Sequence, residues 1–391
     1  MSYTASLRGL CLWKYNHCKN LTSKLMRFQF PHEPTKPKIV SSFPGPAHLE
    51  AIQEIQSPAF SDVDYHEKMQ RFVNFKLSKG NYFKDTDGNS ILDMNASQAG
   101  LVLGYNNDDL INARTTEVYD RFVTHKVDAN ALPTTDYADI IREMVMTAAP
   151  KGMVRVHLGG GNSAAEANEH CLSVALKHYA RDHKIADPTN LCVMGFDNSN
   201  HGQTTGTLSC SSVDANPDNL PAFPWPKAEY PQLKYPLAKY EHENRAEEDR
   251  CIEVIKNIIS TQRAEGKDVG AMIIEPISSL GNQMATPYFY KTLRNLAKDE
   301  GIPFVVDETK TGMGSSGKNW AHEYWYLQDD KTPDFMTFGG KSGISGWYST
   351  NEHRYMLAEK SRAFTQNLDM VKLLNYGTIW KVIEGKGLLH I

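Results

Sequence analysis

The sequence of 391 residues lacks several patterns that mark well-known classes of site. Its six cysteines are scattered without CxxC spacing, which argues against a zinc site and fits free thiols in a reducing compartment. No apolar run approaches the roughly 18 residues that a membrane span requires. A net charge of −4 gives no reason to expect nucleic acid. We therefore expect no metal site, no transmembrane segment and no nucleic-acid partner.

Acidic residues are also absent from the first 32 residues, which are rich in serine and threonine. The basic residues there are Arg8, Lys14, Lys19, Lys24 and Arg27. This composition is typical of a mitochondrial import sequence, and a basic surface arm is the alternative. We expect residues 1–40 to form a basic N-terminal arm of a mitochondrial protein, and this arm could remain attached after import.

A turn signal stands in the next part of the chain, residues 41–110. Asp87-Gly88 lies between apolar stretches, and this dipeptide supplies the positive backbone angles of a tight hairpin turn. The pattern predicts paired strands at Asn81–Phe83 and Ser90–Met94, preceded by a charged helical stretch that leads into Gly80. Residues 41–110 are thus expected to be an N-terminal segment with a β-hairpin.

From residue 111 to residue 391 apolar runs alternate with helical segments, which is typical of an α/β domain with a mostly parallel sheet flanked by helices. The stretch from Asp214 to Glu243, rich in proline and aromatic residues, is expected to be a long surface excursion. The predicted strands are Val154–Leu158, Leu191–Phe196, Ala271–Ile274, Ile302–Val306 and Phe335–Phe338.

An acid and a lysine follow two of these strands. Asp307 comes directly after one apolar run, and Lys341 follows another through Gly339-Gly340. Ligands of open α/β sheets bind at the carboxyl ends of the strands. Pyridoxal phosphate needs a lysine amine for its aldehyde and a carboxylate for its pyridine nitrogen, so the pair suggests this cofactor. The alternatives are a capping or loop-anchoring aspartate and a solvated loop lysine.

A second anion-binding feature is a junction of strand, glycine loop and helix at Leu158-Gly-Gly-Gly-Asn-Ser163. Ser163 and Glu166 have the spacing of a capping box, and free amides at a helix start attract a phosphate. Simple helix capping is the alternative. The spacing does not match the dinucleotide or Walker glycine fingerprints.

Taken in order along the chain, these segments resemble the class III, fold type I aminotransferases, and most closely the 4-aminobutyrate aminotransferases of eukaryotes. The likeness covers nearly the whole chain from about residue 40. It is carried by Phe43-Pro-Gly-Pro46, Lys79-Gly-Asn-Tyr82, Asp87-Gly-Asn89, Ala149-Pro-Lys-Gly-Met153, the loop 162–168, Leu233-Lys-Tyr-Pro236, Ile274-Glu-Pro276, Asp307-Glu308 and the run 317–325.

The resemblance implies a role for each matched residue. Lys341 would be the imine lysine, Asp307 would lie under the pyridine nitrogen, and Ser163 with Ala164 would hold the phosphate. Glu275 would lie on the substrate side. The resemblance therefore predicts a pyridoxal phosphate pocket in an aminotransferase fold.

Several positions depart from the family pattern. Asn200 precedes His201-Gly202 where the family has an aromatic residue that stacks on the cofactor ring, a contact of about 0.5–1.5 kcal/mol. Gln203 replaces the arginine that grips the substrate carboxylate, which removes about 1.5–3 kcal/mol. Lys310 stands where a glutamine near the cofactor oxygen is common. Together these changes predict weaker binding of cofactor and substrate.

Two further expectations follow from the resemblance. Gly161 and Ala164 hold the places of a cysteine pair found in some animal relatives, so no iron-sulfur cluster is expected. The 50 residues after Lys341, from 391 − 341, are too few for the family's C-terminal small domain, so that domain is expected to be missing and the cleft open. An open cleft admits water and loosens the substrate, which slows transamination.

The leading hypothesis is a catalytically impaired aminotransferase-like chain that acts as a structural or accessory subunit of a mitochondrial assembly. Its partners would be other protein subunits, as a homodimer, with a complete paralogue, or in a larger complex. The alternative is an active pyridoxal-phosphate transaminase of an ω-amino acid such as 4-aminobutyrate. A cofactor-binding module without turnover is the third possibility.

Overall fold

The computed structural model describes residues 32–55, 72–97, 99–125, 134–159, 163–328, 331–341, 343–351 and 368–390. The expected basic arm falls mostly on residues 1–31, which lie outside this description. The described residues divide into two compact units. The first reaches Asp120 and includes the residues from Lys381 onward, and the second runs from Arg121 to Trp380.

The first unit contains a three-stranded antiparallel sheet of β1 (Val73–Lys79), β2 (Tyr82–Asp85) and β3 (Ser90–Leu92). The predicted hairpin is confirmed, with Gly88 in the positive-φ conformation that its turn requires. The charged helix expected before Gly80 is wrong from Val73 onward, because Val73, Phe75 and Leu77 alternate with a period of two and form β1. Helices α2 (Pro46–Ile55) and α4 (Asp108–Ala113) belong to the same unit.

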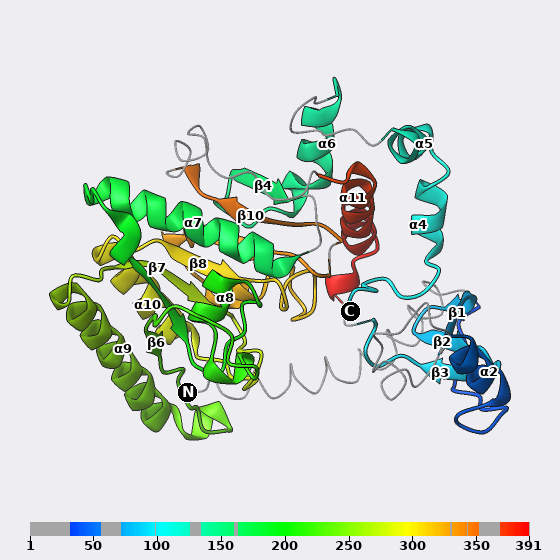
Figure 1. The fold of residues 1–391 in the computed structure, drawn as a ribbon, viewed down its shortest axis with the longest axis horizontal. Coiled ribbons are helices and arrows are strands. Elements are labelled where there is room, and N and C mark those ends of the chain that lie inside the picture. The colour runs from blue at the N-terminus through cyan, green and yellow to red at the C-terminus, as the bar shows by residue number, and fades with distance from the viewer. Residues whose placement is uncertain are drawn as a thin grey trace, which may run out of the picture. The chain divides into compact units, whose positions relative to one another are not determined.

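The second unit is built on a seven-stranded sheet, in the order β4-β10-β9-β8-β7-β5-β6 (Figure 1). The strands β5 to β9 pair in parallel, whereas β10 is antiparallel to both of its neighbours. A mostly parallel sheet flanked by helices is thus confirmed. The strands are β4 (Arg155–Gly159), β5 (Cys192–Phe196), β6 (Lys227–Ala228), β7 (Val269–Ile274), β8 (Phe304–Asp307), β9 (Phe335–Phe338) and β10 (Ser345–Ser349).

Helix α7 (Ala164–Asp182) crosses one face of this sheet, as Figure 1 shows. Its buried Cys171 and Ala175 pack with Val305 of β8, whereas Arg294 of α10 (Pro287–Asp299) lies over the Phe304 ring. Because successive strand residues point to opposite faces, α7 and α10 cover different faces. The remaining helices are α5 (Glu117–Thr124), α6 (Tyr137–Met144), α8 (Thr205–Cys210), α9 (Glu241–Ala264) and α11 (Met370–Gly385).

Strand β10 was not predicted from the sequence. Its residues Ser-Gly-Trp-Tyr-Ser read as a loop, yet all five are buried. Gly346 explains part of this composition, since a Cβ atom there would lie 2.3 Å from the carbonyl oxygen of His157 on the neighbouring strand. The close approach of the two backbones therefore requires glycine at this position.

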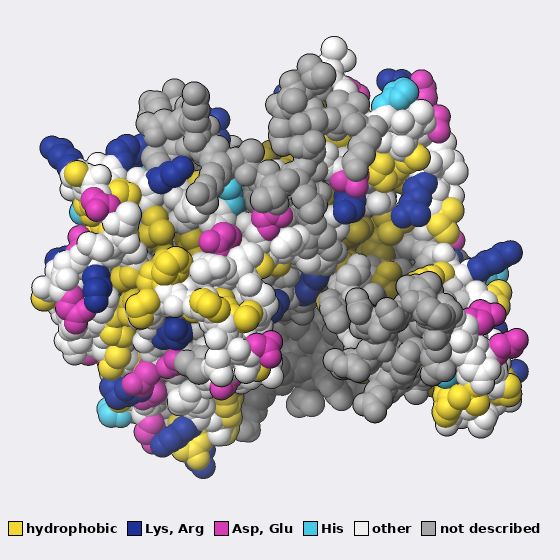
Figure 2. Space-filling view, viewed as in Figure 1, with side chains coloured by type: hydrophobic (Ala, Val, Ile, Leu, Met, Phe, Trp, Pro, Cys, Tyr) yellow, Lys and Arg dark blue, Asp and Glu magenta, His cyan; other side chains and the backbone are white. Residues whose placement is uncertain are grey.

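The excursion predicted from Asp214 to Glu243 is only partly at the surface. Ala228 forms the short edge strand β6 beside β5, and Tyr230 is buried, with its hydroxyl group 2.6 Å from that of Tyr290. Most of the stretch is exposed, as predicted. The edge strand was not predicted because the proline content hid it, and an edge strand tolerates proline nearby. The last part of the stretch begins α9. Charged side chains of both signs on this helix are visible at the lower left of Figure 2, and Arg250 forms an ion pair with Glu247.

The described cysteines Cys171, Cys192, Cys210 and Cys251 are all free and buried. Burial raises the pKa of the Cys192 thiol to about 12, and the charge of Asp268 acts in the same direction. In the described part of the chain no helix is both long enough and apolar enough to cross a membrane.

A stack of two imidazoles and an indole joins β4, α7 and β10. The His157 ring lies 4.6 Å from that of His170 and 5.2 Å from that of Trp347, and the indole nitrogen donates to His170 Nδ1 at 3.0 Å. Burial, followed by the charge of His170, lowers the pKa of His157 from 6.5 to about 4. The unfolded chain therefore binds this proton more readily than the folded chain.

We expect acid to weaken the second unit through His157. The contribution of the neutral imidazole is fully present above pH 6.5 and is lost as the pH falls toward 4, which corresponds to about 3 kcal/mol of unfolding free energy. Urea unfolding of wild type and His157→Gln across this range measures the effect, with exposed His242→Gln as control. Equal pH slopes for wild type and His157→Gln would contradict the prediction.

Candidate functional site

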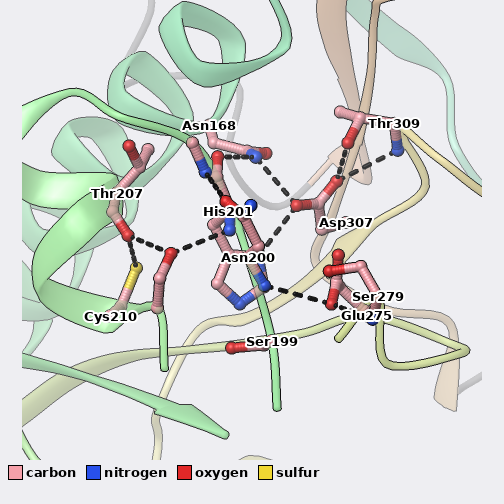
Figure 3. Close-up of polar contacts among 12 residues, drawn as sticks. Asn168, Ser199, Asn200, His201, Thr207, Cys210, Glu275, Ser279, Asp307 and Thr309 are labelled. Atoms are coloured by element: carbon pink, nitrogen blue, oxygen red, sulfur yellow. Dashed lines mark hydrogen bonds and ion pairs between the residues drawn. The ribbon is translucent and has the colours of Figure 1, made fainter. Parts of the chain in front are cut away.

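A cluster of buried polar groups lies where β5, β7 and β8 end. These three strands are parallel and adjacent, so their carboxyl ends meet at one edge of the sheet. Asn200 and His201 follow β5, Glu275 follows β7, and Asp307 ends β8. The structure thus brings together four residues that the sequence predicted for one site, as Figure 3 shows.

Asp307 is the hub of this group. Its Oδ2 accepts hydrogen bonds from His201 Nδ1 and Asn168 Nδ2, both at 2.8 Å. Its Oδ1 accepts from the backbone nitrogen of Thr309 at 3.0 Å and from the Thr309 hydroxyl group at 2.6 Å. The side chains of Asp307 and His201 are both 0% exposed. Each of the two carboxylate oxygens therefore accepts two hydrogen bonds, and protein atoms cover the whole carboxylate.

This environment sets the charge of Asp307. Burial alone would raise the pKa of its carboxyl group, but the hydrogen bond and charge of His201, with Thr309 and Lys310, outweigh burial and hold the pKa below 3.8. Asp307 is thus an anion stabilised by the protein's own donors. His201 Nε2 is buried and makes no hydrogen bond.

Glu275 and Lys310 form an ion pair beside this hub. Lys310 Nζ lies 3.0 Å from Glu275 Oε1 and also donates to the backbone oxygen of Asn200. Glu275 Oε2 accepts from the backbone nitrogens of Ser279 at 2.9 Å and Asn200 at 3.3 Å. Both carboxylate oxygens of Glu275 therefore accept from neighbouring donors of the same chain.

Lys341 lies beyond the end of β9, as the sequence predicted. Its Nζ donates to the backbone oxygen of Lys310 and to the hydroxyl group of Ser315. Burial lowers the pKa of the Lys341 amine, and the charge of Glu308 acts against this shift. The amine is consequently easier to deprotonate than an exposed lysine, which favours nucleophilic chemistry.

The start of α7 lies close to the end of β9. Ser163 caps α7, because its hydroxyl group accepts from the Glu166 backbone nitrogen at 3.1 Å. A Cβ atom on Gly339 would lie 3.0 Å from Ala164 Cα, so the helix start is adjacent to the segment that carries Lys341. Residues 160–162, including Gly161, lie outside the described residues. The capping alternative is seen directly, and the phosphate role stays a prediction.

Gln203 is not brought to the hub by any contact that the structure gives. Its amide nitrogen donates to the backbone oxygen of Ala215 at 2.9 Å, so the side chain is used to hold the turn η4 (Val213–Ala215). The Asn200 side chain accepts from the backbone nitrogen of Gly202 at 3.1 Å. The side chains of Asn200 and Gln203 thus both bond to backbone groups.

Sequence reasoning missed Asn168 and Thr309 as members of the site. Asn168 is fully buried on the face of α7 that carries Ala167 and Cys171, and a polar residue among apolar helix positions was the available signal. Thr309 follows Asp307 by two residues, the spacing at which a carboxylate bonds its own backbone. Both residues supply donors to Asp307.

His201, Glu275 and Asp307 offer ligand atoms that all lie within 4.8 Å of one another, the one group of metal-ligand type among the described residues. The Lys310 ammonium is already paired with Glu275, and Asp307 already accepts four hydrogen bonds. A neighbouring positive charge opposes a cation, so we assign no metal to this group.

The same observations test the group against pyridoxal phosphate. A pyridine nitrogen needs a carboxylate oxygen with an available lone pair, and the cofactor needs open space above it. Asp307 offers neither an unfilled oxygen nor exposed surface, and Lys310 bridges the ends of the strands beside it. The described residues, as arranged, do not fit the cofactor.

The fold itself is widely shared. The structure matches lysine aminotransferase from M. tuberculosis in the internal aldimine form with a TM-score of 0.72 and 20% identity, over 86% of this chain and 78% of that one. It matches a PLP-bound amine transaminase from an uncultivated Pseudomonas species with a TM-score of 0.69 and 17% identity, over 85% and 74%. The second unit therefore has the architecture of the fold type I aminotransferases.

Sequence comparison gives the family. Residues 64–364 match aminotransferase class-III. The chain is 32% identical over 389 residues to 4-aminobutyrate aminotransferase of Kluyveromyces lactis, covering 92% of this chain and 78% of the relative. It is 33% identical over 347 residues to that of Dictyostelium discoideum, covering 83% and 67%. The chain belongs to the class III aminotransferase family, as its sequence predicted, and this membership points to pyridoxal phosphate as the family's cofactor.

Proposed function

We propose that this chain is a catalytically impaired relative of 4-aminobutyrate aminotransferase that acts as a structural or accessory subunit of a mitochondrial assembly. One observation carries the proposal. Asp307, the residue matched to the pyridine-binding acid, is covered by protein atoms and bonded to four donors. It stabilises the fold and has no oxygen left for a ring nitrogen.

The substrate side supports the same proposal. Gln203 has no positive charge and bonds a backbone oxygen, so a substrate carboxylate loses a charge-assisted partner worth about 1.5–3 kcal/mol. Asn200 offers no aromatic face, which removes about 0.5–1.5 kcal/mol of ring stacking. Together these losses amount to about 2–4.5 kcal/mol and would lower kcat/KM by about 30- to 2,000-fold.

The cellular part of the proposal has separate support. The related 4-aminobutyrate aminotransferases of Caenorhabditis elegans and Sus scrofa are named as mitochondrial, and the first 32 residues of this chain are basic and free of acids. In the first unit Phe75 and Met94 are 68% and 87% exposed. Large exposed apolar side chains are common at protein interfaces, which favours a protein partner.

An active ω-amino acid transaminase is the second candidate. The retention of Lys341, whose amine has a lowered pKa through burial, favours it. The names of the relatives point to 4-aminobutyrate as the amino donor. In that case the group around Asp307 would rearrange to admit the cofactor.

An amino-transfer assay separates the two candidates. With added pyridoxal phosphate, 4-aminobutyrate and 2-oxoglutarate, we expect glutamate formation at least about thirtyfold slower than by the Kluyveromyces lactis relative assayed in parallel. Size separation of mitochondrial extracts should find the chain in a species much larger than 44.0 kDa. Turnover within tenfold of the relative would refute the proposed impairment.

A further inference from the structure

Lys310 links three strand ends with one ammonium group. It lies in the turn after β8, pairs with Glu275 at the end of β7 at 3.0 Å, and donates to the Asn200 carbonyl oxygen after β5. The Lys310 side chain is 44% exposed, whereas that of Glu275 is 3% exposed. The lysine thus reaches from the surface to a buried carboxylate across the carboxyl edge of the sheet.

The same ion pair fixes the backbone of Asn200 from both sides. Glu275 Oε2 accepts from the Asn200 nitrogen at 3.3 Å, and Lys310 donates to the Asn200 oxygen. The next residue is His201, whose ring donates to Asp307 at 2.8 Å. Holding Asn200 therefore adds to the bonds of the His201 backbone with Ser211 and Asn168, and together they position the ring that covers one oxygen of Asp307.

Lys310 also acts on Asp307 through charge, since its ammonium is among the groups that hold the pKa of this carboxyl group low. Asp307 ends β8, and ligands of open α/β sheets approach from the carboxyl edge, where Asn200, Thr309 and Lys310 lie. On this route a cofactor would displace the contacts of Lys310 with Glu275 and Asn200. Those contacts are charge-assisted and therefore among the stronger hydrogen bonds of the site.

We propose that Lys310 keeps the site at the carboxyl ends of β5, β7 and β8 closed to pyridoxal phosphate, a role that we call the lock. This inference rests on the proposed function and adds Lys310 to the residues that close the site. Without the ammonium, the Asn200 carbonyl oxygen loses its charged donor, and Glu275, Ser211 and Asn168 remain as anchors of the segment. The way to Asp307 then opens at lower cost.

The test is binding of pyridoxal phosphate to the full chain, followed by tryptophan fluorescence and by visible absorbance. Lys310→Gln removes the charge and keeps a donor to Glu275, and we expect it to bind the cofactor at least about tenfold more tightly than wild type. Lys310→Arg retains the charge and should bind like wild type. Lys318→Gln is the matched control. The Lys318 ammonium lies over the rings of Tyr324 and Tyr326, so this variant removes the same charge without removing a contact to Glu275 or Asn200.

The outcomes distinguish the lock from the proposed function. If wild type binds the cofactor as tightly as Lys310→Gln, the lock is wrong. If neither binds, although near-ultraviolet circular dichroism shows Lys310→Gln to be folded, the lock is also wrong while the proposed impairment stands. If wild type both binds and transfers amino groups at the rate of its relative, both proposals fail. Tight binding by Lys310→Gln alone supports both.

Discussion

Replacing Asp307 with alanine should lower the free energy of unfolding by about 3–5 kcal/mol. The substitution removes an anion that accepts from His201, Asn168 and Thr309, and it leaves their donors buried without a partner. Unsatisfied buried donors each cost about 1–3 kcal/mol. Urea unfolding at neutral pH, followed by tryptophan fluorescence, measures the difference from wild type.

The control for this substitution is Asp218→Ala, which changes an exposed aspartate and should alter stability by less than about 0.5 kcal/mol. A loss below about 1 kcal/mol for Asp307→Ala would contradict the assignment of Asp307 to a structural hub. It would instead favour a carboxylate kept for a ligand.

Asp334→Ala should have a similarly large effect at the opposite end of β8. Asp334 accepts from both terminal nitrogens of Arg294, at 2.8 and 3.0 Å, and from the Phe304 backbone nitrogen at 2.8 Å. The two side chains are only 6% and 11% exposed. Removing one partner of a buried ion pair costs about 3–5 kcal/mol, because the other charge remains buried. Thermal unfolding by calorimetry measures the loss.

Asp139→Ala is the matched comparison, since it breaks an ion pair with Arg142 in which both side chains are more than 60% exposed, at 64% and 71%. Exposed pairs contribute about 0–1 kcal/mol. Equal effects of Asp334→Ala and Asp139→Ala would show that burial of the Arg294 pair adds nothing to stability.

The sequence predicted the central strands because each is a continuous apolar run. The run 335–338 matches β9, and β8 differs from its prediction by shifts at both ends. Such runs are typical of parallel strands buried on both faces. β10 escaped because its serines and glycine resemble a loop, and its place between β4 and β9 depends on contacts far apart in the chain. Pattern alone carries no information about such pairing.

The site was predictable to the extent that strand ends define it. Asp307, Glu275 and Lys341 each follow a strand, and a sheet edge gathers such residues. The contacts among them were not predictable, because they depend on which rotamer each side chain adopts. The Asn168 bond to Asp307 spans 139 residues, and the pairing of Lys310 with Glu275 spans 35. The residue types predicted a cofactor pocket. The contacts among these residues, as the structure arranges them, do not fit the cofactor.

Strand β8 has a carboxylate fastened at each extremity. Asp334 anchors Phe304 at its beginning, and Asp307 is tied to α7 and to the His201 segment at its finish. A shift of the strand register by one residue would turn Val305 to the other side of the sheet and break the hydrogen bonds at both ends of the strand. The centre of the sheet is therefore a rigid platform. We therefore expect a ligand or subunit that arrives at the carboxyl edge to reshape the loops there before it shifts the strands.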